Sequence, residues 1–311
     1  MRNRSVSITG ATGFVGWRLA EAFRDAGWRV RAVVRPGNRR PVPGEVEAVE
    51  APLDREAPAL ARYRHYHNLR DTEFSSGVVH AAGLTRARHQ AAFDEVNVGG
   101  TRTVVEAAND SGAHLILISS LAATGSGTPA RASRENDPPC PVNPYGRSKL
   151  EAEAVVRSLA RVPWTILRPA AVYGPRDRGF LPLFRLASRG IFLVSTKPSM
   201  AFTLLHVDDV ARATLLAAAD DRAFGQTFLL GHPDPATTAD ILRALADAFD
   251  RPYRPWRVPD FALNAAAWAG DLSWVLGRQP LVDGQRLAEL RAEGFVCSAD
   301  RIREALGFTA G

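Results

Sequence analysis

The sequence predicts an α/β fold, in which a doubly wound parallel sheet is followed by a smaller, mostly helical C-terminal cap. In the first 169 residues, short apolar runs rich in β-branched residues alternate with helical patterns. Such runs are typical of strands covered on both faces, as in a parallel sheet. After about residue 169, Pro, Gly and Arg interrupt short pieces, and helical patterns follow. These observations predict a sheet domain and a cap over its edge.

The elements are expected in the following order. Strands are predicted over residues 5–9, 29–35, 46–50, 78–82, 114–119 and 164–168. Helices are predicted over residues 14–26, 93–111 and 144–160, where apolar residues recur at helical spacing. Later helices are expected at about 208–219, 237–249, 260–276 and 283–292, and residues 57–76 are interpreted as a solvated helix and loop. We expect residues 1–169, with a returning segment at about 203–232, to form the sheet domain, and residues 170–202 and 233–311 to form the cap.

Composition excludes several classes of protein. No apolar run approaches the length of a membrane span, so we expect a cytoplasmic protein. Cys140 and Cys297 are too few for a disulfide framework or a metal cluster, and no metal is expected. The net charge of +6 does not predict nucleic-acid binding, because the basic residues are scattered and no recognition motif accompanies them. Lys149 and Lys197 are the only lysines among 39 basic residues, so chemistry that needs an ammonium is expected at Lys149.

Glycines follow the first expected strand at positions 10, 13 and 16, and a helix follows them. Gly10 permits a tight turn, Gly13 lets the backbone approach a pyrophosphate, and Gly16 lets the helix pack against the strand. The N–H groups at the helix start then bind the anion. An ordinary glycine turn is the alternative. The pattern predicts a dinucleotide-binding Rossmann fold, in which the cofactor also contacts Thr12, Phe14 and Val15.

The residue at the end of the second strand selects the cofactor in such folds. An acidic residue accepts hydrogen bonds from the ribose of NAD, whereas an arginine pairs with the 2′-phosphate of NADP. Arg35 stands there, with Arg39 and Arg40 just beyond. The sequence therefore favours NADP(H). NAD(H) is the alternative if Arg35 only stacks on the adenine, and residues 50–54 leave the adenine contact unassigned.

The glycine spacing resembles the extended short-chain dehydrogenase/reductase superfamily, also described as the NAD-dependent epimerase/dehydratase family. Further motifs follow in the family's order along nearly the whole chain. They are His80-Ala81-Ala82-Gly83, Asn97-Val98-Gly99-Gly100-Thr101, Ser119-Ser120, Tyr145-Gly146-Arg147-Ser148-Lys149, Arg168-Pro169, Tyr173-Gly174-Pro175 and His206-Val207-Asp208-Asp209-Val210. The resemblance implies additional cofactor contacts at Ala81, Ala82, Gly83, Pro169 and Val172.

Tyr145 and Lys149 are four residues apart, so they share one face of the expected helix. A phenol is a poor base at neutral pH, and a nearby ammonium is expected to lower its pKa. Taken alone, such a pair is usually a surface pair. The resemblance implies that Tyr145 is the acid/base, that Lys149 also holds the nicotinamide ribose, and that Ser120, rather than the alternative Ser119, hydrogen-bonds the substrate oxygen. It also implies that Asn97 orders a water linked to Lys149.

The expected reaction is a hydride transfer between the nicotinamide and a secondary alcohol or ketone. Dehydration is disfavoured, because Leu121-Ala122 rather than a carboxylate pair follows Ser120. The C-terminal stretch and residues 82–86 resemble the dihydroflavonol-reductase and 3β-hydroxysteroid-dehydrogenase-like subgroup. We therefore expect an NAD(P)(H)-dependent oxidoreductase with an apolar small-molecule substrate. The alternatives are an NAD-dependent nucleotide-sugar epimerase and, third, a non-catalytic dinucleotide-binding protein.

Two groups of apolar residues carry further expectations. Aromatic residues of the cap fit either an apolar substrate pocket or a plain core: Phe180, Phe202, Trp256, Phe261, Trp268 and Trp274. The family's common dimer pairs helices 93–111 and 144–160 with their copies in a four-helix bundle. We expect a homodimer through two apolar stripes: Ala92, Val96, Val104 and Ala107, and Ala152, Val155, Val156 and Leu159.

Overall fold

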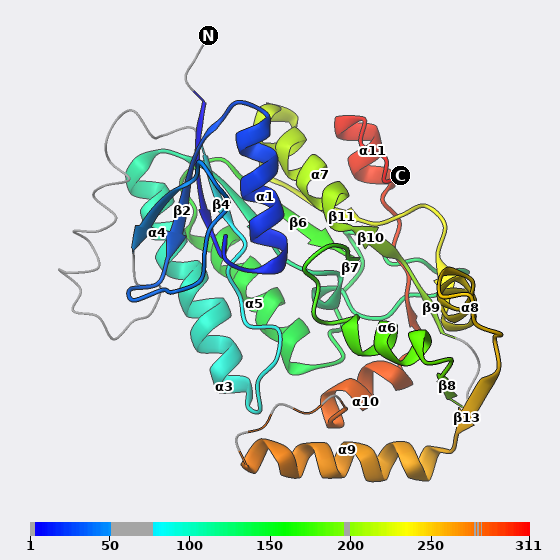
Figure 1. Cartoon of the computed structure of the whole chain (residues 1–311). Helices are drawn as coiled ribbons and strands as arrows, with labels where there is room; N and C mark the ends of the chain where they lie inside the picture. The colour runs from blue at the N-terminus through cyan, green and yellow to red at the C-terminus, as the bar shows by residue number, and fades with distance from the viewer. Residues whose placement is uncertain (1–3, 51–76, 196–199, 277, 279, 281) are drawn as a thin grey trace.

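A parallel sheet of seven strands stands at the centre of the computed structural model, which describes residues 4–50, 77–195, 200–276, 278, 280 and 282–311 (Figure 1). The strands lie in the order β3-β2-β1-β4-β5-β6-β11. Their bounds are β1 (Ser5–Thr9), β2 (Arg29–Val34), β3 (Glu47–Glu50), β4 (Gly77–His80), β5 (His114–Ile118), β6 (Trp164–Pro169) and β11 (Gln226–Leu230). The order reverses between β1 and β4, which is where open α/β sheets bind ligands beyond the strand ends. The predicted Rossmann fold is confirmed.

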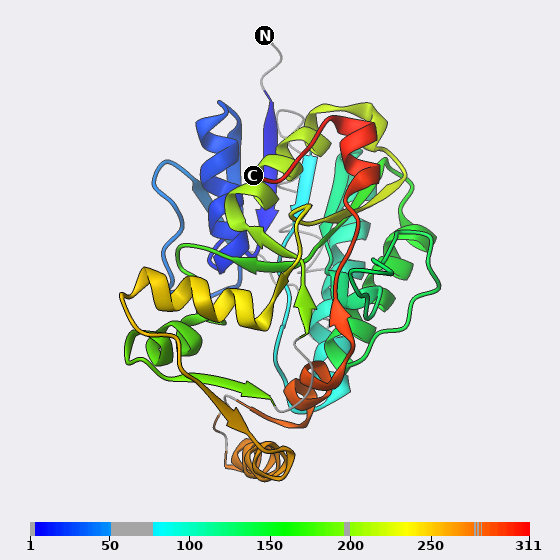
Figure 2. The same ribbon diagram turned by 90° about the vertical axis from the view of Figure 1, so that its right-hand side faces the viewer.

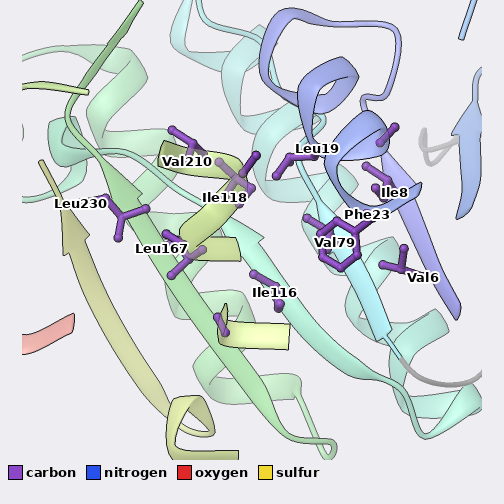
Figure 3. Close-up of a cluster of buried hydrophobic side chains, with 14 of the residues drawn as sticks. Val6, Ile8, Leu19, Phe23, Val79, Ile116, Ile118, Leu167, Val210 and Leu230 are labelled. Atoms are coloured by element: carbon purple, nitrogen blue, oxygen red, sulfur yellow. The ribbon is translucent and has the colours of Figure 1, made fainter. Parts of the chain in front are cut away.

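Helices cover both faces of the sheet. One face carries α1 (Phe14–Asp25), α7 (Val207–Ala219) and α11 (Asp300–Leu306), and the other carries α4 (Gly100–Ser111) and α5 (Pro144–Leu159). Figure 3 shows Leu19 and Phe23 of α1 packed in the apolar core between the sheet and the first of these faces. The second core joins Val104 of α4 and Val156 of α5 to the strands. Burial on both faces explains why the strands read as continuous apolar runs.

The predicted helix over residues 93–111 is divided into three parts. It begins as α3 (Gln90–Phe93), continues as the π-helix η2 (Asp94–Gly99) and ends as α4. The wider turn of η2 contains Asn97, which is buried. Single π-helical turns inside helices are frequent at functional sites, because the extra residue changes where a side chain points. Apolar spacing alone did not show this turn.

In the region predicted as the cap, the described residues form short strands and four helices beyond the sheet, and α9 lies along the outer edge of this region (Figures 1 and 2). The helices are α6 (Leu181–Ser188), α8 (Thr238–Ala248), α9 (Asp260–Val275) and α10 (Gly284–Arg291). The strands are β7 (Ala171–Tyr173), β8 (Phe192–Ser195), β9 (Ala201–Phe202), β12 (Ala236–Thr237), β13 (Pro255–Val258) and β14 (Gly294–Phe295). β10 (Leu204–His206) pairs with β7 and lies in the segment predicted to return to the sheet domain. Outside the region predicted as the cap, the described residues also contain the short 3₁₀ turns η3 (Leu121–Ala123) and η4 (Asp221–Ala223). Ala187, Phe192, Leu242 and Ala246 form a small separate core.

The C-terminal segment departs from the predicted cap of residues 233–311. Ile302 and Leu306 of α11 are buried in the same core as α1 and α7. The end of the chain therefore packs on the sheet, because its apolar residues complete that face. The sequence had not shown α6, α11 or β11 as separate elements. Residues 51–76, which include the predicted segment 57–76 and most of the stretch 50–54, lie outside the described residues.

The predicted dimer stripes are largely inside the chain. Five of their eight residues are buried: Val104, Ala107, Ala152, Val155 and Val156. They pack within the chain, so they are not available to a second subunit. The prediction of these stripes is wrong, because helical spacing does not say which apolar face meets the sheet. Within the described residues, no helix is both long and apolar enough to cross a membrane.

Candidate active site

The glycine loop packs tightly against the end of β4. Gly10 has a φ of 75°, and a Cβ there would lie 2.6 Å from the backbone N of Ala82. A Cβ on Gly16 would lie 2.1 Å from the carbonyl O of Gly10, so α1 approaches β1 as the sequence predicted. Gly13 is exposed and begins α1 without a capping side chain among the described residues. The first-turn N–H groups, beside the partly exposed Thr12, Phe14 and Val15, therefore fit a pyrophosphate.

The loop after β4 brings Gly83 close to Asn97 and Lys149. The Asn97 amide Oδ1 accepts a hydrogen bond from Leu84 N at 2.7 Å, and its Nδ2 donates to Leu84 O at 3.0 Å. A Cβ on Gly83 would lie 3.2 Å from Asn97 Oδ1 and 3.9 Å from Lys149 Nζ. Ala82 N, one residue earlier, donates to Thr9 Oγ1 at 3.2 Å. Asn97, whose Nδ2 also donates to Ser148 Oγ at 2.8 Å, thus ties this loop to α5, and Thr9 ties it to β1.

Lys149 is buried on the inner face of α5. Its Nζ donates a hydrogen bond to Ile118 O, at the end of β5, over 2.7 Å. Burial lowers the pKa of Lys149 to about 8, and the carboxylate of Glu153, one turn further along α5, opposes that change. Asn143 begins α5 by accepting a hydrogen bond from Gly146 N at 2.7 Å. This cap fixes the helix start, and with it the position of Tyr145.

Tyr145 lies one turn before Lys149 and hydrogen-bonds the Ser120 side chain. Burial raises the pKa of Tyr145 above its usual value; the Ser120 hydrogen bond lowers it, and the Glu289 carboxylate raises it further. The expected net lowering by Lys149 is therefore not found. The Lys149 ammonium is directed at the Ile118 carbonyl, and the cost of burying a phenolate dominates. The phenol is consequently protonated at neutral pH.

A buried ion pair lies behind Lys149, and the sequence analysis missed it. Arg168 Nε and Nη2 donate to the two carboxylate oxygens of Glu153 at 2.9 and 2.7 Å. Ser119 Oγ donates to Glu153 Oε1 at 2.5 Å, which occupies Ser119 and leaves Ser120 as the hydroxyl beside Tyr145. Burial alone would raise the pKa of Glu153, but its bonds to Arg168 and Ser119 hold it below the usual value. The sequence signal that could have indicated Glu153 is its four-residue spacing from Lys149, which repeats the spacing of Lys149 from Tyr145.

A polar pocket opens beside Tyr145. Its lining residues come from the loop after β4, from the start of α5 and from α10: Thr85, Arg86, Ala87, Asn143, Tyr145, Asp283, Gln285, Arg286 and Glu289. Asn143 Nδ2 hydrogen-bonds the Glu289 carboxyl group, and burial raises the pKa of Glu289. Arg86 bonds Asp283 at 3.4 Å and also the Pro280 carbonyl. The sequence indicated no pocket role for α10, which lies more than a hundred residues beyond Tyr145.

Arg35 directly follows β2 and is exposed, as are Arg39 and Arg40. The register Thr9↔Val33 places this strand end beside the glycine loop. Glu50, at the end of β3, accepts a hydrogen bond from Gly37 N at 3.2 Å, so a carboxylate also lies at this edge. Pro169 ends β6, and Val172 lies in β7 just beyond it. The structure therefore brings the predicted cofactor residues to the carboxyl edge of the sheet.

Comparison with known proteins supports this geometry. The family model described as "NAD dependent epimerase/dehydratase family" matches residues 6–231. A ceramide reductase of Caulobacter vibrioides is 34% identical over 90% of this chain and 81% of its own length. A UDP-glucose 4-epimerase of Vibrio cholerae is 30% identical over 82% and 78%. The structure of the Thermus thermophilus UDP-glucose 4-epimerase complex with NAD has a TM-score of 0.75 at 22% identity, covering 98% of this chain and 94% of that one. The chain thus belongs to the NAD-dependent epimerase/dehydratase family and is an NAD(P)-dependent enzyme of the extended short-chain dehydrogenase/reductase type.

Proposed function

We propose that the chain is a reductase or dehydrogenase that interconverts a ketone and a secondary alcohol, with Tyr145 as the acid/base. The observation that carries this proposal is the position of the Tyr145 phenol. It bonds Ser120, precedes the buried Lys149 by one turn and lines the pocket. The 34% identity to a ceramide reductase extends over most of the chain and supports a reductase.

The bound dinucleotide supplies or accepts the hydride. In the reductive direction, Tyr145 Oη donates its proton to the substrate oxygen, and its raised pKa keeps that proton in place at neutral pH. Ser120 Oγ hydrogen-bonds the same oxygen and stabilises the charge that develops there. Lys149 Nζ, near Gly83, would hold the nicotinamide ribose. The α1 start would hold the pyrophosphate, and Ala81, Ala82, Gly83, Pro169 and Val172 would line the rest of the cofactor site.

The substrate we propose has a polar group near its reacting carbon and an apolar remainder. Arg86, Asp283 and Glu289 form a polar lining next to Tyr145, and a wholly apolar substrate would cover these charged groups without offering them a hydrogen bond. Of the six cap aromatics that fitted an apolar pocket, Trp256, Phe261 and Trp268 are exposed instead. An amphipathic substrate reconciles the polar pocket with the apolar substrate expected from the sequence.

NADP(H) as the preferred cofactor is part of the proposal, with NAD(H) as the alternative. Arg35, Arg39 and Arg40 supply the positive charge that a 2′-phosphate requires. Glu50 works in the opposite direction, because a carboxylate at this edge favours a ribose with free hydroxyl groups. The preference therefore depends on which charge is nearer to the bound ribose.

We also propose a homodimer, on the basis of the family resemblance. Of the stripe residues, Val96 is 43% exposed and remains available to a second subunit. The interface we propose uses the outward face of η2 around Val96, together with the outward faces of α4 and α5, rather than the predicted stripes. Sedimentation of the full chain at micromolar concentration tests this, and a monomer alone would contradict it.

An epimerase is the second candidate, because the Vibrio cholerae UDP-glucose 4-epimerase is 30% identical over most of this chain. An epimerase regenerates its cofactor within each turnover. It would therefore retain NAD on purification and interconvert nucleotide sugars without added cofactor. Both results together, obtained with this chain, would overturn the reductase proposal.

The experiment that tests the reductase is an absorbance assay of NADPH or NADH oxidation with a panel of ketones that carry a nearby polar group. Tyr145→Phe removes the proton donor and should leave less than about a tenth of the wild-type kcat, a loss of at least roughly 1.4 kcal/mol. Cofactor affinity, measured by fluorescence titration, should change by no more than a few-fold. Tyr253→Phe is the matched control, because Tyr253 packs on Phe192 in the cap. A Tyr145→Phe variant with near-normal kcat would show that the assigned role is wrong.

A further inference from the structure

The helix α9 is apolar on most of its surface although it lies at the edge of the molecule (Figures 1 and 2). Its buried residues are small, Ala267 and Gly270, whereas Phe261 is 76% exposed and Trp268 is 71% exposed. A helix that is apolar all round is normally buried on all sides. The outward face of α9 therefore has the composition of an interface.

Exposed apolar residues also lie on β13, which directly precedes α9, and on its partner strand β8. Trp256 of β13 is 69% exposed and pairs in register with Leu193 of β8, which is also exposed. We call the resulting surface the apolar patch, and it consists of Leu193, Trp256, Phe261, Trp268, Leu272, Val275 and Leu276. Large apolar side chains grouped on one surface mark a site of contact with a protein or a membrane.

Exposed arginines flank the apolar patch in the sequence. Arg254 and Arg257 precede α9, and Arg278 follows it. Arg291 of α10 reaches α9 from the side, where its Nη2 donates to Asn264 Oδ1 at 2.6 Å. Asp271 of α9 accepts a hydrogen bond from Gly284 N at 3.1 Å and so faces α10. Four arginines against Asp260 and Asp271 make the residues next to the apolar patch net basic, in a chain of net charge +6.

We propose that the apolar patch binds the surface of an anionic phospholipid bilayer. Its aromatic and aliphatic side chains would enter the boundary between headgroups and acyl chains, and the neighbouring arginines would contact the lipid phosphates. A second copy of this chain is a poorer occupant, because a symmetric contact would place two net basic sets of residues against each other. This inference goes beyond the proposed function and does not depend on it.

The position of α9 links the proposed membrane contact to the pocket beside Tyr145. Trp274, on the inner side of α9, donates from Nε1 to Asp283 Oδ2 at 3.1 Å, and Asp283 lines the pocket beside Tyr145. One helix thus separates the apolar patch from the pocket. A chain docked by this surface holds its pocket next to the membrane, where amphipathic ketones and alcohols accumulate.

Vesicle flotation of the full chain tests the proposal. The wild-type protein should float with vesicles of phosphatidylcholine and phosphatidylglycerol in equal parts, and float less with phosphatidylcholine alone or at high salt. Trp268→Glu and Phe261→Glu should each lower the partition coefficient by at least about tenfold, because a large apolar side chain no longer enters the lipid. Phe249→Glu, at the end of α8 and outside the apolar patch, is the matched control and should leave flotation unchanged.

Three outcomes would overturn the proposal. The first is a wild-type chain that does not float with the mixed vesicles. The second is flotation that Trp268→Glu, Phe261→Glu and Phe249→Glu reduce equally. The third is a dimer in sedimentation that Trp268→Glu dissociates, without vesicle binding, which would make a second copy the occupant. Tyr145→Phe should float like the wild type, so failure of the membrane proposal is distinguishable from failure of the proposed reaction.

Discussion

The helices α5 and α9 both contain 16 residues, but they distribute polarity in opposite ways. α5 buries Ser148, Lys149 and Glu153, and each of these side chains has a hydrogen-bond partner. α9 instead exposes Phe261 and Trp268. Buried charges are costly unless they are paired, and exposed apolar surface is costly unless something covers it. The contrast teaches that helices which depart from ordinary amphipathicity mark sites in this chain. α5 carries polar side chains on its buried face, at the proposed active site, and α9 carries apolar side chains on its exposed face, at the proposed docking surface.

The largest expected effect concerns the buried charges of α5. Glu153→Ala should lower the free energy of unfolding by about 3–5 kcal/mol, because it leaves Arg168 buried without its carboxylate. Glu151→Ala, on the exposed side of the same helix, should change it by less than about 0.5 kcal/mol. Urea unfolding measures both values. Equal effects of the two substitutions would remove the distinction between the inner and outer faces of α5.

A pH series sharpens the same comparison at Lys149. The folded pKa is lowered from 10.5 to about 8, so the unfolded chain binds more protons between these values. The contribution of Lys149 to the free energy of unfolding therefore increases as the pH rises through that window. Lys149→Met should be more stable than the wild type at pH 7 by up to about 3 kcal/mol, and the difference should shrink toward pH 10. Urea unfolding at both pH values checks this.

Lys149→Arg is the control for that series. It retains a buried charge throughout the pH range and should show no pH-dependent gain. It should nevertheless lose hydride transfer nearly as fully as Lys149→Ala, because a planar guanidinium does not replace a compact ammonium beside the ribose. A constant difference between Lys149→Met and the wild type from pH 7 to pH 10 would contradict the burial argument. Normal turnover of Lys149→Arg would contradict the assigned role in ribose binding.

Exposed charge at the sheet edge should matter for binding rather than for folding. Arg35→Asp should weaken NADPH binding by roughly 10- to 150-fold, the effect of one charge-assisted hydrogen bond, and leave NADH binding similar or improved. Fluorescence titration at low and high salt measures this, and the preference should shrink as salt rises. Arg161→Asp, an exposed arginine between α5 and β6, is the control. Equal wild-type affinity for NADPH and NADH at low salt would leave NADP(H) unsupported.

The smallest expected effect is the stability change caused by substitutions on the outer face of α9. Leu272→Gln should change the free energy of unfolding by less than about 0.5 kcal/mol, because the side chain packs little in the isolated chain. Val156→Ala in α5, by contrast, should cost about 2 kcal/mol, because Val156 is fully buried. Thermal unfolding compares the two. A large loss of stability in Leu272→Gln would show that α9 needs its outer face for folding, and the comparison of the two helices would fail.

Local pattern was sufficient for much of the fold and for part of the candidate site. The six predicted strands agree with β1 to β6 to within one or two residues at each end, because each is a short apolar run bounded by turn residues. The glycine loop was predictable for the same reason, since its turn, close approach and helix start depend on adjacent residues. Tyr145 and Lys149 share a helix face through their spacing alone, and Arg35 follows its strand directly.

The remaining features depend on residues that are distant in the sequence. Glu153 meets Arg168, and Glu289 reaches Tyr145, because separate elements pack together. The pKa of Tyr145 rises rather than falls, since burial is the sum of everything that surrounds the phenol. Apolar spacing identified α5 and α9 as helices but could not say which faces the sheet would cover. Sequence by itself determined what is local in this protein, and tertiary structure decided burial, because burial depends on every neighbour at once.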